Sequence, residues 1–128
     1  YVAFGNLFAR SGQDSPVFRL DRHPTMSRHP VTPMREADLR LVLAEQTTRP
    51  MELVDAAMLD AGRTPSASEG VTLFDTVGEH HLAPVGRAVW EMATTRPPLF
   101  AVGSSGLEYA LAEHWRQNGE LPPPPEFR

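Results

Sequence analysis

A Gly-Ser-Ser-Gly turn at residues 103–106 is the segment best suited to hold an anion. It follows an apolar run at residues 99–102 and precedes apolar residues at helical spacing. A turn between a buried strand and a helix brings together free backbone N–H groups, two hydroxyls and the positive end of the helix dipole. The candidate ligands for a carboxylate or a phosphate are Gly103, Ser104, Ser105 and Gly106. A helix cap with a tight turn would use the same residues, and the spacing does not decide between the two.

A second group of donors lies in a repeated Arg-His-Pro tripeptide. Its members are Arg22, His23, Arg28 and His29. A loop with these side chains could clamp an anionic substrate through charge-assisted hydrogen bonds. The alternative is a solvated loop stiffened by prolines, and the residues alone favour it.

Polar residues also follow three other apolar runs. Ligands of open parallel sheets bind beyond the carboxyl ends of the strands, so Gly5-Asn6, Asp55 and Asp75 occupy places where substrate contacts are expected. Asn6 is a candidate binding residue, and either aspartate could act as a general base. An aspartate at a strand end more often caps the next turn or helix, which is the plainer interpretation.

The adjacent His80 and His81 do not form a predicted metal site. Neighbouring residues on a helix point about 100° apart, so the two side chains cannot readily bind one ion from one face. We expect them at the surface. His114 is expected at the margin of the core, beside an apolar helix stripe.

Composition excludes several classes of function. The chain has 128 residues and a net charge of −4, which suits one domain or a large piece of one and disfavours a nucleic-acid binder. All basic residues are arginine and there is no cysteine, which excludes a P-loop lysine, a Schiff-base lysine and thiolate chemistry. No apolar run approaches the ~20 residues that cross a bilayer. A soluble, cytoplasmic protein without a membrane partner is therefore expected.

Alternating strand and helix patterns predict an α/β fold, with a mostly parallel sheet, helices on its faces and a Rossmann-like partial domain. Thr32 is the expected cap of the first helix, and Pro84 with Gly86 predicts a late start or a kink in the second. The tail at 121–128 holds four consecutive prolines and is expected to be a linker after a domain at 1–120. Strands are expected at 1–4, 17–20, 51–54, 71–74 and 99–102, helices at 34–47, 82–93 and 107–117, and loops at 5–33 and 62–70.

Three segments carry a family resemblance. They are Phe-Gly-Asn-Leu-Phe-Ala-Arg at 4–10, the run at 20–34 that holds the two Arg-His-Pro tripeptides together with residues 36–39 and Gln46-Thr47, and Val-Gly-Ser-Ser-Gly-Leu-Glu-Tyr-Ala-Leu at 102–111. Together they resemble the four-carbon acid sugar kinase family, whose members have also been labelled Hrp-dependent type III effectors. The resemblance is weak between residues 56 and 70. It places the chain in the latter half of the family's N-terminal, sugar-acid-binding domain.

The resemblance implies ATP-dependent phosphorylation of a four-carbon sugar acid such as erythronate, threonate or an oxo-tetronate. It implies that ATP and Mg²⁺ are bound mainly by a C-terminal nucleotide-binding domain of the same chain. It also implies an earlier segment of Asp-Asp-x-Thr-Gly type, so we assign no general base and expect these 128 residues alone to be inactive. The turn at 103–106 becomes a better candidate for the substrate carboxylate, and the Arg-His-Pro loop for the substrate-side wall.

A second hypothesis from another class stays open. The chain could be a non-catalytic module that binds a small anion or a protein partner. Continuation of the native reading frame into a second α/β domain would distinguish the two hypotheses. Assembly into a homo-oligomer is not decided by the sequence.

Overall fold

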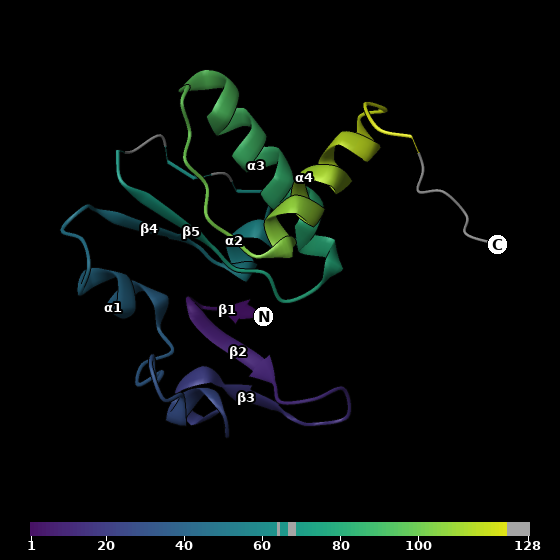
Figure 1. Ribbon diagram of the computed structural model, residues 1–128. Helices are drawn as coiled ribbons and strands as arrows, with labels where there is room; N and C mark the ends of the chain where they lie inside the picture. The colour runs from purple at the N-terminus through teal and green to yellow at the C-terminus, as the bar shows by residue number, and fades with distance from the viewer. Residues whose placement is uncertain (64, 67–68, 123–128) are drawn as a thin grey trace.

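Two sheets with helices between and above them form the protein (Figure 1). The structure is a computed structural model, and it describes residues 1–63, 65–66 and 69–122. The expected α/β class is confirmed, but the sheet is not mostly parallel, because the first three strands pair antiparallel and only the last two run parallel. The strands are β1 (Val2–Ala3), β2 (Asn6–Arg10), β3 (Val17–Arg19), β4 (Met51–Val54) and β5 (Val71–Phe74).

The helices are η1 (Leu20–Arg22), η2 (Met26–Arg28), α1 (Leu39–Ala44), α2 (Ala56–Asp60), η3 (Glu79–His81), α3 (Leu82–Thr95) and α4 (Ser105–Gln117). The predicted strands at 17–20, 51–54 and 71–74 and the helices at 82–93 and 107–117 are confirmed in place. The short helix α2 was not predicted. Residue 64, residues 67–68 of the predicted loop and residues 123–128 of the predicted linker lie outside the described residues.

The expected long loop at 5–33 is wrong at its start, where β2 pairs with β1. The chain reverses through Phe4 and Gly5, whose φ angles are +50° and +77°. Two successive residues with positive φ are typical of the tight turns that match the twist of a hairpin. Phe4 and Gly5 therefore form the hairpin turn that connects β1 to β2. Farther along, β3 pairs with β2 and leads into η1 and η2.

A helix was predicted at 34–47, but α1 spans only Leu39–Ala44. It begins late because acidic side chains accept hydrogen bonds from the backbone N–H groups that precede it. The Glu36 carboxylate accepts the backbone N–H groups of Ala37 and Asp38, both at 2.8 Å. Asp38 then caps α1 by accepting the N–H of Arg40 at 3.0 Å. Local side-chain acceptors of this kind compete with helix formation. The cap is Asp38 and not Thr32.

The core lies between the parallel sheet and the helices α3 and α4. Its fully packed members are Val54, Leu59, Val85, Val89 and Ala110. The two helices approach so closely that a Cβ added to Gly86 would collide with the backbone carbonyl of Ala110. The predicted late start or kink at Pro84 is not seen, since α3 begins at Leu82 and Pro84 lies in the first turn, where no intrahelical N–H partner is needed.

The expected buried strand at 99–102 is not formed. Leu99 packs against the core, but Phe100 and Val102 are exposed. The chain there has no regular secondary structure and joins neither sheet. No helix in the described ranges is long and apolar enough to cross a lipid bilayer.

Candidate functional site

The carboxyl end of β5 is followed by a buried acidic residue, Asp75. Its side chain is fully buried. One carboxylate oxygen accepts the N–H groups of Phe4 at 2.6 Å and Ala56 at 3.0 Å, and the other accepts the N–H of Gly5 at 2.9 Å. Three donors offset the cost of burying the charge. Asp75 thus fastens the β1–β2 turn and the start of α2 to one edge of the parallel sheet.

Asp55 has a similar structural role at the end of β4. Its carboxylate caps α2 by accepting the N–H of Met58 at 2.8 Å. The plainer interpretation, a cap on the next helix, is therefore confirmed for Asp55. It is wrong for Asp75, whose carboxylate accepts N–H groups of distant segments and not of the turn that follows it. Backbone donors already occupy both carboxylates in the structure.

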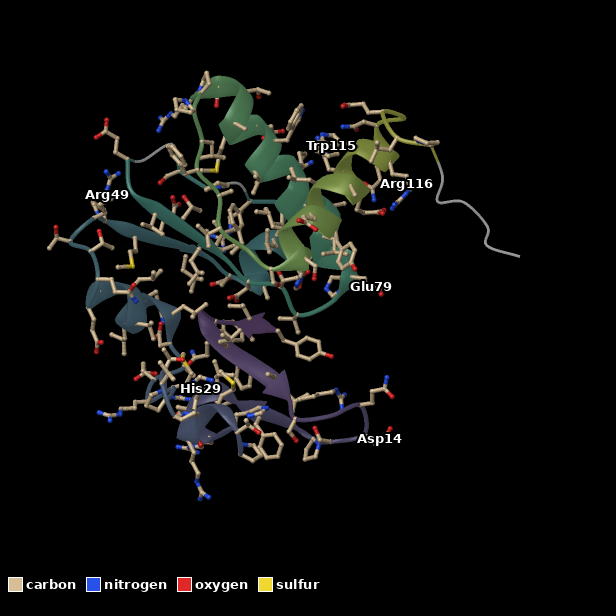
Figure 2. All side chains as sticks on the ribbon, in the orientation of Figure 1. Asp14, His29, Arg49, Glu79, Trp115 and Arg116 are labelled. Atoms are coloured by element: carbon tan, nitrogen blue, oxygen red, sulfur yellow. The ribbon has the colours of Figure 1, made fainter. Side chains whose placement is uncertain are left out.

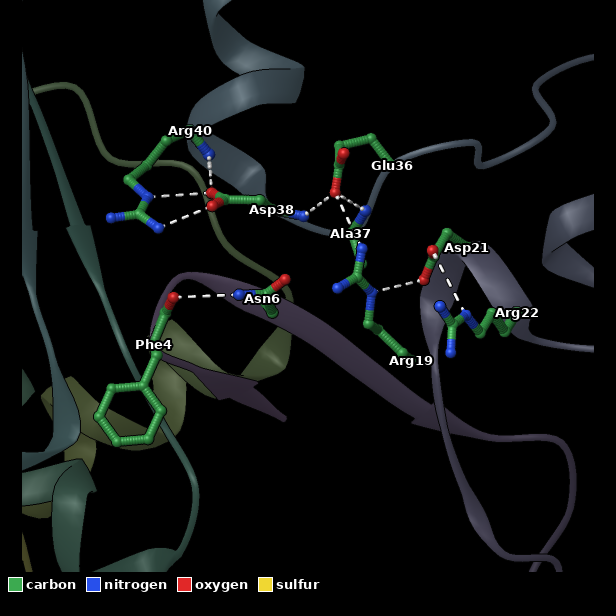
Figure 3. A network of polar contacts seen from close by, with 9 residues as sticks. All are labelled: Phe4, Asn6, Arg19, Asp21, Arg22, Glu36, Ala37, Asp38 and Arg40. Carbon is green, nitrogen blue, oxygen red and sulfur yellow. Dashed lines mark hydrogen bonds and ion pairs between the residues drawn. The ribbon is translucent and has the colours of Figure 1, made fainter.

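Arg40 supplies a cation beside this edge (Figure 3). Its guanidinium forms a two-point contact with Asp38, with Nε at 2.9 Å from Oδ1 and Nη2 at 2.6 Å from Oδ2. The Nε atom would lie 3.1 Å from a Cβ added to Gly5, so glycine permits both this approach and the positive φ there. The Arg40 side chain is 45% exposed, which leaves it accessible to a ligand.

Asp38 and Arg40 each stabilise the charged form of the other. The hydrogen bond from Arg40 lowers the pKa of Asp38 below its ordinary value, with a further contribution from the backbone N–H of Arg40. The same side-chain hydrogen bond raises the pKa of Arg40, and the charge of Asp75 adds to the effect. The pair therefore stays ionised throughout the neutral range.

Asn6, the predicted binding residue at the start of β2, lies next to this pair (Figure 3). Its backbone bridges to Asp38, and the Leu39 N–H donates to the Gly5 carbonyl at 2.9 Å. The Asn6 side chain donates to the Phe4 carbonyl at 3.1 Å and is half-buried. The structure thus brings Asn6, Asp38 and Arg40 to the edge that Asp75 organises.

The turn at 103–106 begins α4 and is exposed. Ser104 is the N-terminal flanking residue of the helix, and its side chain makes no capping hydrogen bond. Leu107, in the first turn of α4, packs against the core cluster that contains Val54 at the end of β4. The helix start therefore lies near the carboxyl end of the parallel sheet. The Leu107 N–H already donates to the Ser104 carbonyl at 3.1 Å, so the N–H groups of Ser105 and Gly106 are the ones that a ligand could use.

Both histidines of the Arg-His-Pro loop hold that loop together. The buried His23 accepts the N–H groups of Thr25 and Met26 at Nδ1, both at 3.1 Å. This leaves its proton on Nε2, which lies 3.3 Å from the Arg10 carbonyl. His29 Nδ1 likewise accepts the N–H of Thr32 at 3.0 Å.

The arginines of that loop point to solvent. Arg22 and Arg28 are exposed, and Arg22 lies 4.0 Å from Asp21, which pairs mainly with Arg19 (Figure 3). Figure 2 places His29 below the β4–β5 sheet, whereas Trp115 on α4 lies above it. The structure does not bring the Arg-His-Pro loop and the turn at 103–106 together, and contact of either with a substrate stays a prediction.

Sequence reasoning missed the Asp38–Arg40 pair. The available signal was an aspartate, a residue type that often caps helices, two positions before an arginine. The sequence instead predicted Thr32 as the cap, with Asp38 inside the first turns of the helix. Only pairing between Asn6 and Asp38 brings Arg40 to the hairpin turn, and this contact is not local in sequence.

His80, His81 and Asp60 form the one cluster of metal-ligating side chains among the described residues. The expected surface position of His81, the last residue of η3, is wrong, because its side chain is buried. His81 Nδ1 accepts the Val77 N–H at 3.1 Å, so Nε2 carries the proton and donates to Asp60 at 3.1 Å. That protonated nitrogen is not free to bind a metal ion, and the cluster connects η3 to α2.

His114 was expected at the margin of the core, and its side chain is buried on α4.

Comparison with known proteins identifies the class. The family model described as "Sugar-binding N-terminal domain" matches residues 1–111, and the chain belongs to this family. The resemblance to four-carbon acid sugar kinases is thereby confirmed.

Similar whole proteins are sugar-acid kinases by name. The chain is 51% identical to the 3-oxo-isoapionate kinase of Paraburkholderia graminis over 134 residues, covering 99% of this chain and 28% of that protein. It is 31% identical to the 3-oxo-tetronate kinase of Methylobacterium radiotolerans, covering 90% of this chain and 26% of the relative. The chain thus spans less than a third of the length of these relatives.

Proposed function

We propose that this chain forms the sugar-acid-binding part of an ATP-dependent kinase whose substrate is a four-carbon sugar acid or a closely related 3-oxo sugar acid. The observation that carries the proposal is the 51% identity to a 3-oxo-isoapionate kinase over 99% of the chain. The names of the relatives also favour a kinase over the alternative of a non-catalytic binding module.

The geometry supports a site for a small polyhydroxy anion at the carboxyl edge of β4–β5. A carboxylate is matched by free N–H groups at the start of α4, by the hydroxyls of Ser104 and Ser105, and by the Arg40 guanidinium. Substrate hydroxyls need neutral acceptors and donors, and the amide of Asn6 is one such group at this edge. Arg22, His23, Arg28 and His29 stay proposed as an outer wall of the site, with the histidines acting through the shape of their loop.

These residues alone offer few side chains that could bind ATP or Mg²⁺. The chain has no lysine, and backbone N–H groups already occupy the Asp55 and Asp75 carboxylates that could bind a cation. We therefore propose that the nucleotide and the metal ion are held mainly by a C-terminal nucleotide-binding domain in the remainder of the full-length protein. The described residues would bind and orient the acceptor, which is a large part of the catalysis of phosphoryl transfer.

The test is ATP-coupled turnover by the full-length protein. The substrates would be 3-oxo-isoapionate, 3-oxo-tetronate, erythronate and threonate, with erythritol as a matched control that has similar hydroxyls but no carboxylate. We expect turnover with at least one acid and none with erythritol, because the proposed site recognises the charge. Equal rates with erythritol, or no turnover of any acid by folded protein that binds ATP, would contradict the proposal.

A further inference from the structure

Phe4 has a backbone conformation that is unusual for a bulky side chain. Its φ angle is +50°, and in the part of the chain that the structure describes no other residue except glycine has a positive φ. A side chain crowds its own backbone in this region, so glycine, asparagine and aspartate are the usual occupants. Hairpin turns with two positive φ angles most often place asparagine or glycine where this chain has Phe4. A phenylalanine at this position therefore costs backbone energy.

Packing of the ring does not offset this cost. Phe4 is 61% exposed. Within the described residues its ring belongs neither to the core cluster nor to any pair of stacked aromatic rings. Single exposed apolar side chains are common on protein surfaces, but an ordinary backbone presents them at no cost. Strained residues concentrate at functional sites, so the combination of strain and exposure indicates a role outside folding.

Four hydrogen bonds hold the turn in this conformation. The Asp75 carboxylate accepts the N–H groups of Phe4 at 2.6 Å and Gly5 at 2.9 Å. The Phe4 carbonyl accepts the side-chain amide of Asn6 at 3.1 Å, and the Gly5 carbonyl accepts the Leu39 N–H at 2.9 Å. A strained backbone persists only where the surrounding contacts determine it this fully. The backbone that carries the ring is thus fixed before any ligand arrives.

The bond to Asp75 places Phe4 at the carboxyl end of β5, which is the edge where the proposed function locates the sugar acid. Figure 3 shows the ring extending from the turn on the side away from Arg40, so this side chain does not cover it. The amide of Asn6 and the guanidinium of Arg40 suit the hydroxyls and the carboxylate of a ligand. A sugar acid also has C–H bonds, and small-molecule sites meet these with apolar or aromatic side chains.

We propose that the Phe4 ring packs against the C–H side of the bound sugar acid and is a specificity-determining residue of the site. This inference rests on the proposed function. A ligand hydroxyl pressed against the ring would lose its hydrogen bonds to water, so the ring favours acids that can turn C–H bonds toward it. Phe4 selects and orients the acid, and it takes no part in proton or phosphoryl transfer.

Calorimetric titration of the full-length protein with 3-oxo-isoapionate and 3-oxo-tetronate tests the contact. We expect Phe4→Asn to bind the tighter of the two acids ~3- to 10-fold more weakly than the wild type, the range of one aromatic contact. Phe4→Tyr keeps an aromatic ring and should bind as the wild type does. Val17→Asn is the matched control, because it also replaces an exposed apolar residue of the same three-stranded sheet. Equal affinities of Phe4→Asn and the wild type would overturn the proposal.

Urea unfolding of the same full-length proteins distinguishes this role from a structural one. Asparagine adopts positive φ more readily than phenylalanine, so Phe4→Asn should lower the equilibrium constant for unfolding at least ~2-fold, while Phe4→Tyr and Val17→Asn show no such gain. A Phe4→Asn variant less stable than the wild type would show that the ring packs against the rest of the protein, and would overturn the proposal.

The two proposals fail in different ways. A folded wild type that binds neither acid would contradict the proposed function, and with it the role of Phe4. Equal binding by the wild type and Phe4→Asn would overturn the role of Phe4 alone.

Discussion

The carboxylate of Asp75 accepts the amide N–H of Gly5, 70 residues earlier in the chain, at a distance of 2.9 Å. This bond joins the turn of the β1–β2 hairpin to the carboxyl end of β5. Since Asn6 follows the turn directly and Arg40 lies against Gly5, one buried acid organises the polar groups of the candidate site.

Replacing Asp75 should therefore destabilise the protein. Asp75→Ala leaves three backbone N–H groups unpaired in a buried place, and we expect a loss of ~3–5 kcal/mol in the free energy of unfolding. Asp75→Asn keeps one acceptor oxygen and should lose less. Urea unfolding measures both, with Asp14→Ala in an exposed loop as the control. A loss for Asp75→Ala no larger than that of the control would refute this role.

Arg40→Gln should raise the pKa of Asp38 toward its ordinary value of 3.8, because the hydrogen bond from Arg40 is the main cause of its lowering. The lowered pKa means that the folded state favours the carboxylate. Its contribution to stability is complete above the ordinary pKa and is lost as the pH falls through the lower, folded value. Carboxyl NMR titration gives the pKa directly. Arg40→Gln should also lose less stability on acidification; identical Asp38 titrations in both proteins would contradict the prediction.

His23 is expected to act through the architecture of its loop. His23→Ala removes the acceptor for two backbone N–H groups, which should cost ~1–3 kcal/mol of stability. His23→Asn offers a side-chain oxygen at a similar position and should recover part of the loss. Thermal unfolding compares these variants with His80→Ala, whose side chain is 66% exposed. Equal stability of His23→Ala and His80→Ala would show that the loop does not depend on this ring.

The contact of α3 with α4 predicts that Gly86 cannot be enlarged. Alanine normally favours a helix, but here its methyl group would collide with the Ala110 carbonyl and force the helices apart. We expect Gly86→Ala to cost ~1–3 kcal/mol despite the gain in helix propensity. Gly12→Ala is the control, since a Cβ there meets no atom within 4 Å. A more stable Gly86→Ala variant in urea unfolding would disprove the close contact.

Local patterns predicted several of the elements, although they missed β2, which pairs with β1 and β3, and the short helix α2. The β-prone run at 71–74 and the helical spacing from Leu82 both depend on neighbouring residues, and both are confirmed. The start of α1 was missed because Glu36 and Asp38 compete for backbone N–H groups, which apolar periodicity does not register. The run at 99–102 has strand composition, but composition cannot supply a partner strand.

The candidate site was predicted only in part, because local patterns do not register contacts between residues that are distant in the sequence. The rule that ligands bind beyond strand ends located Asn6, Asp55 and Asp75 correctly at one edge. It could not locate Arg40, which reaches that edge only through the pairing of Asn6 with Asp38. The charged side chains of the Arg-His-Pro loop predicted contacts with an anionic substrate. In the structure its two histidines accept backbone N–H groups of the loop itself.

Calorimetric titration of the full-length protein with its sugar acid tests the central claim most directly. We expect the double variant Ser104→Ala/Ser105→Ala to bind ~5- to 150-fold more weakly than the wild type, if their hydroxyls bond the carboxylate. Arg87→Gln, on the exposed side of α3, is the control and should bind as the wild type does. Unchanged affinity of the double serine variant would mean that these serines only shape the turn, which contradicts the claim that their hydroxyls bind the carboxylate.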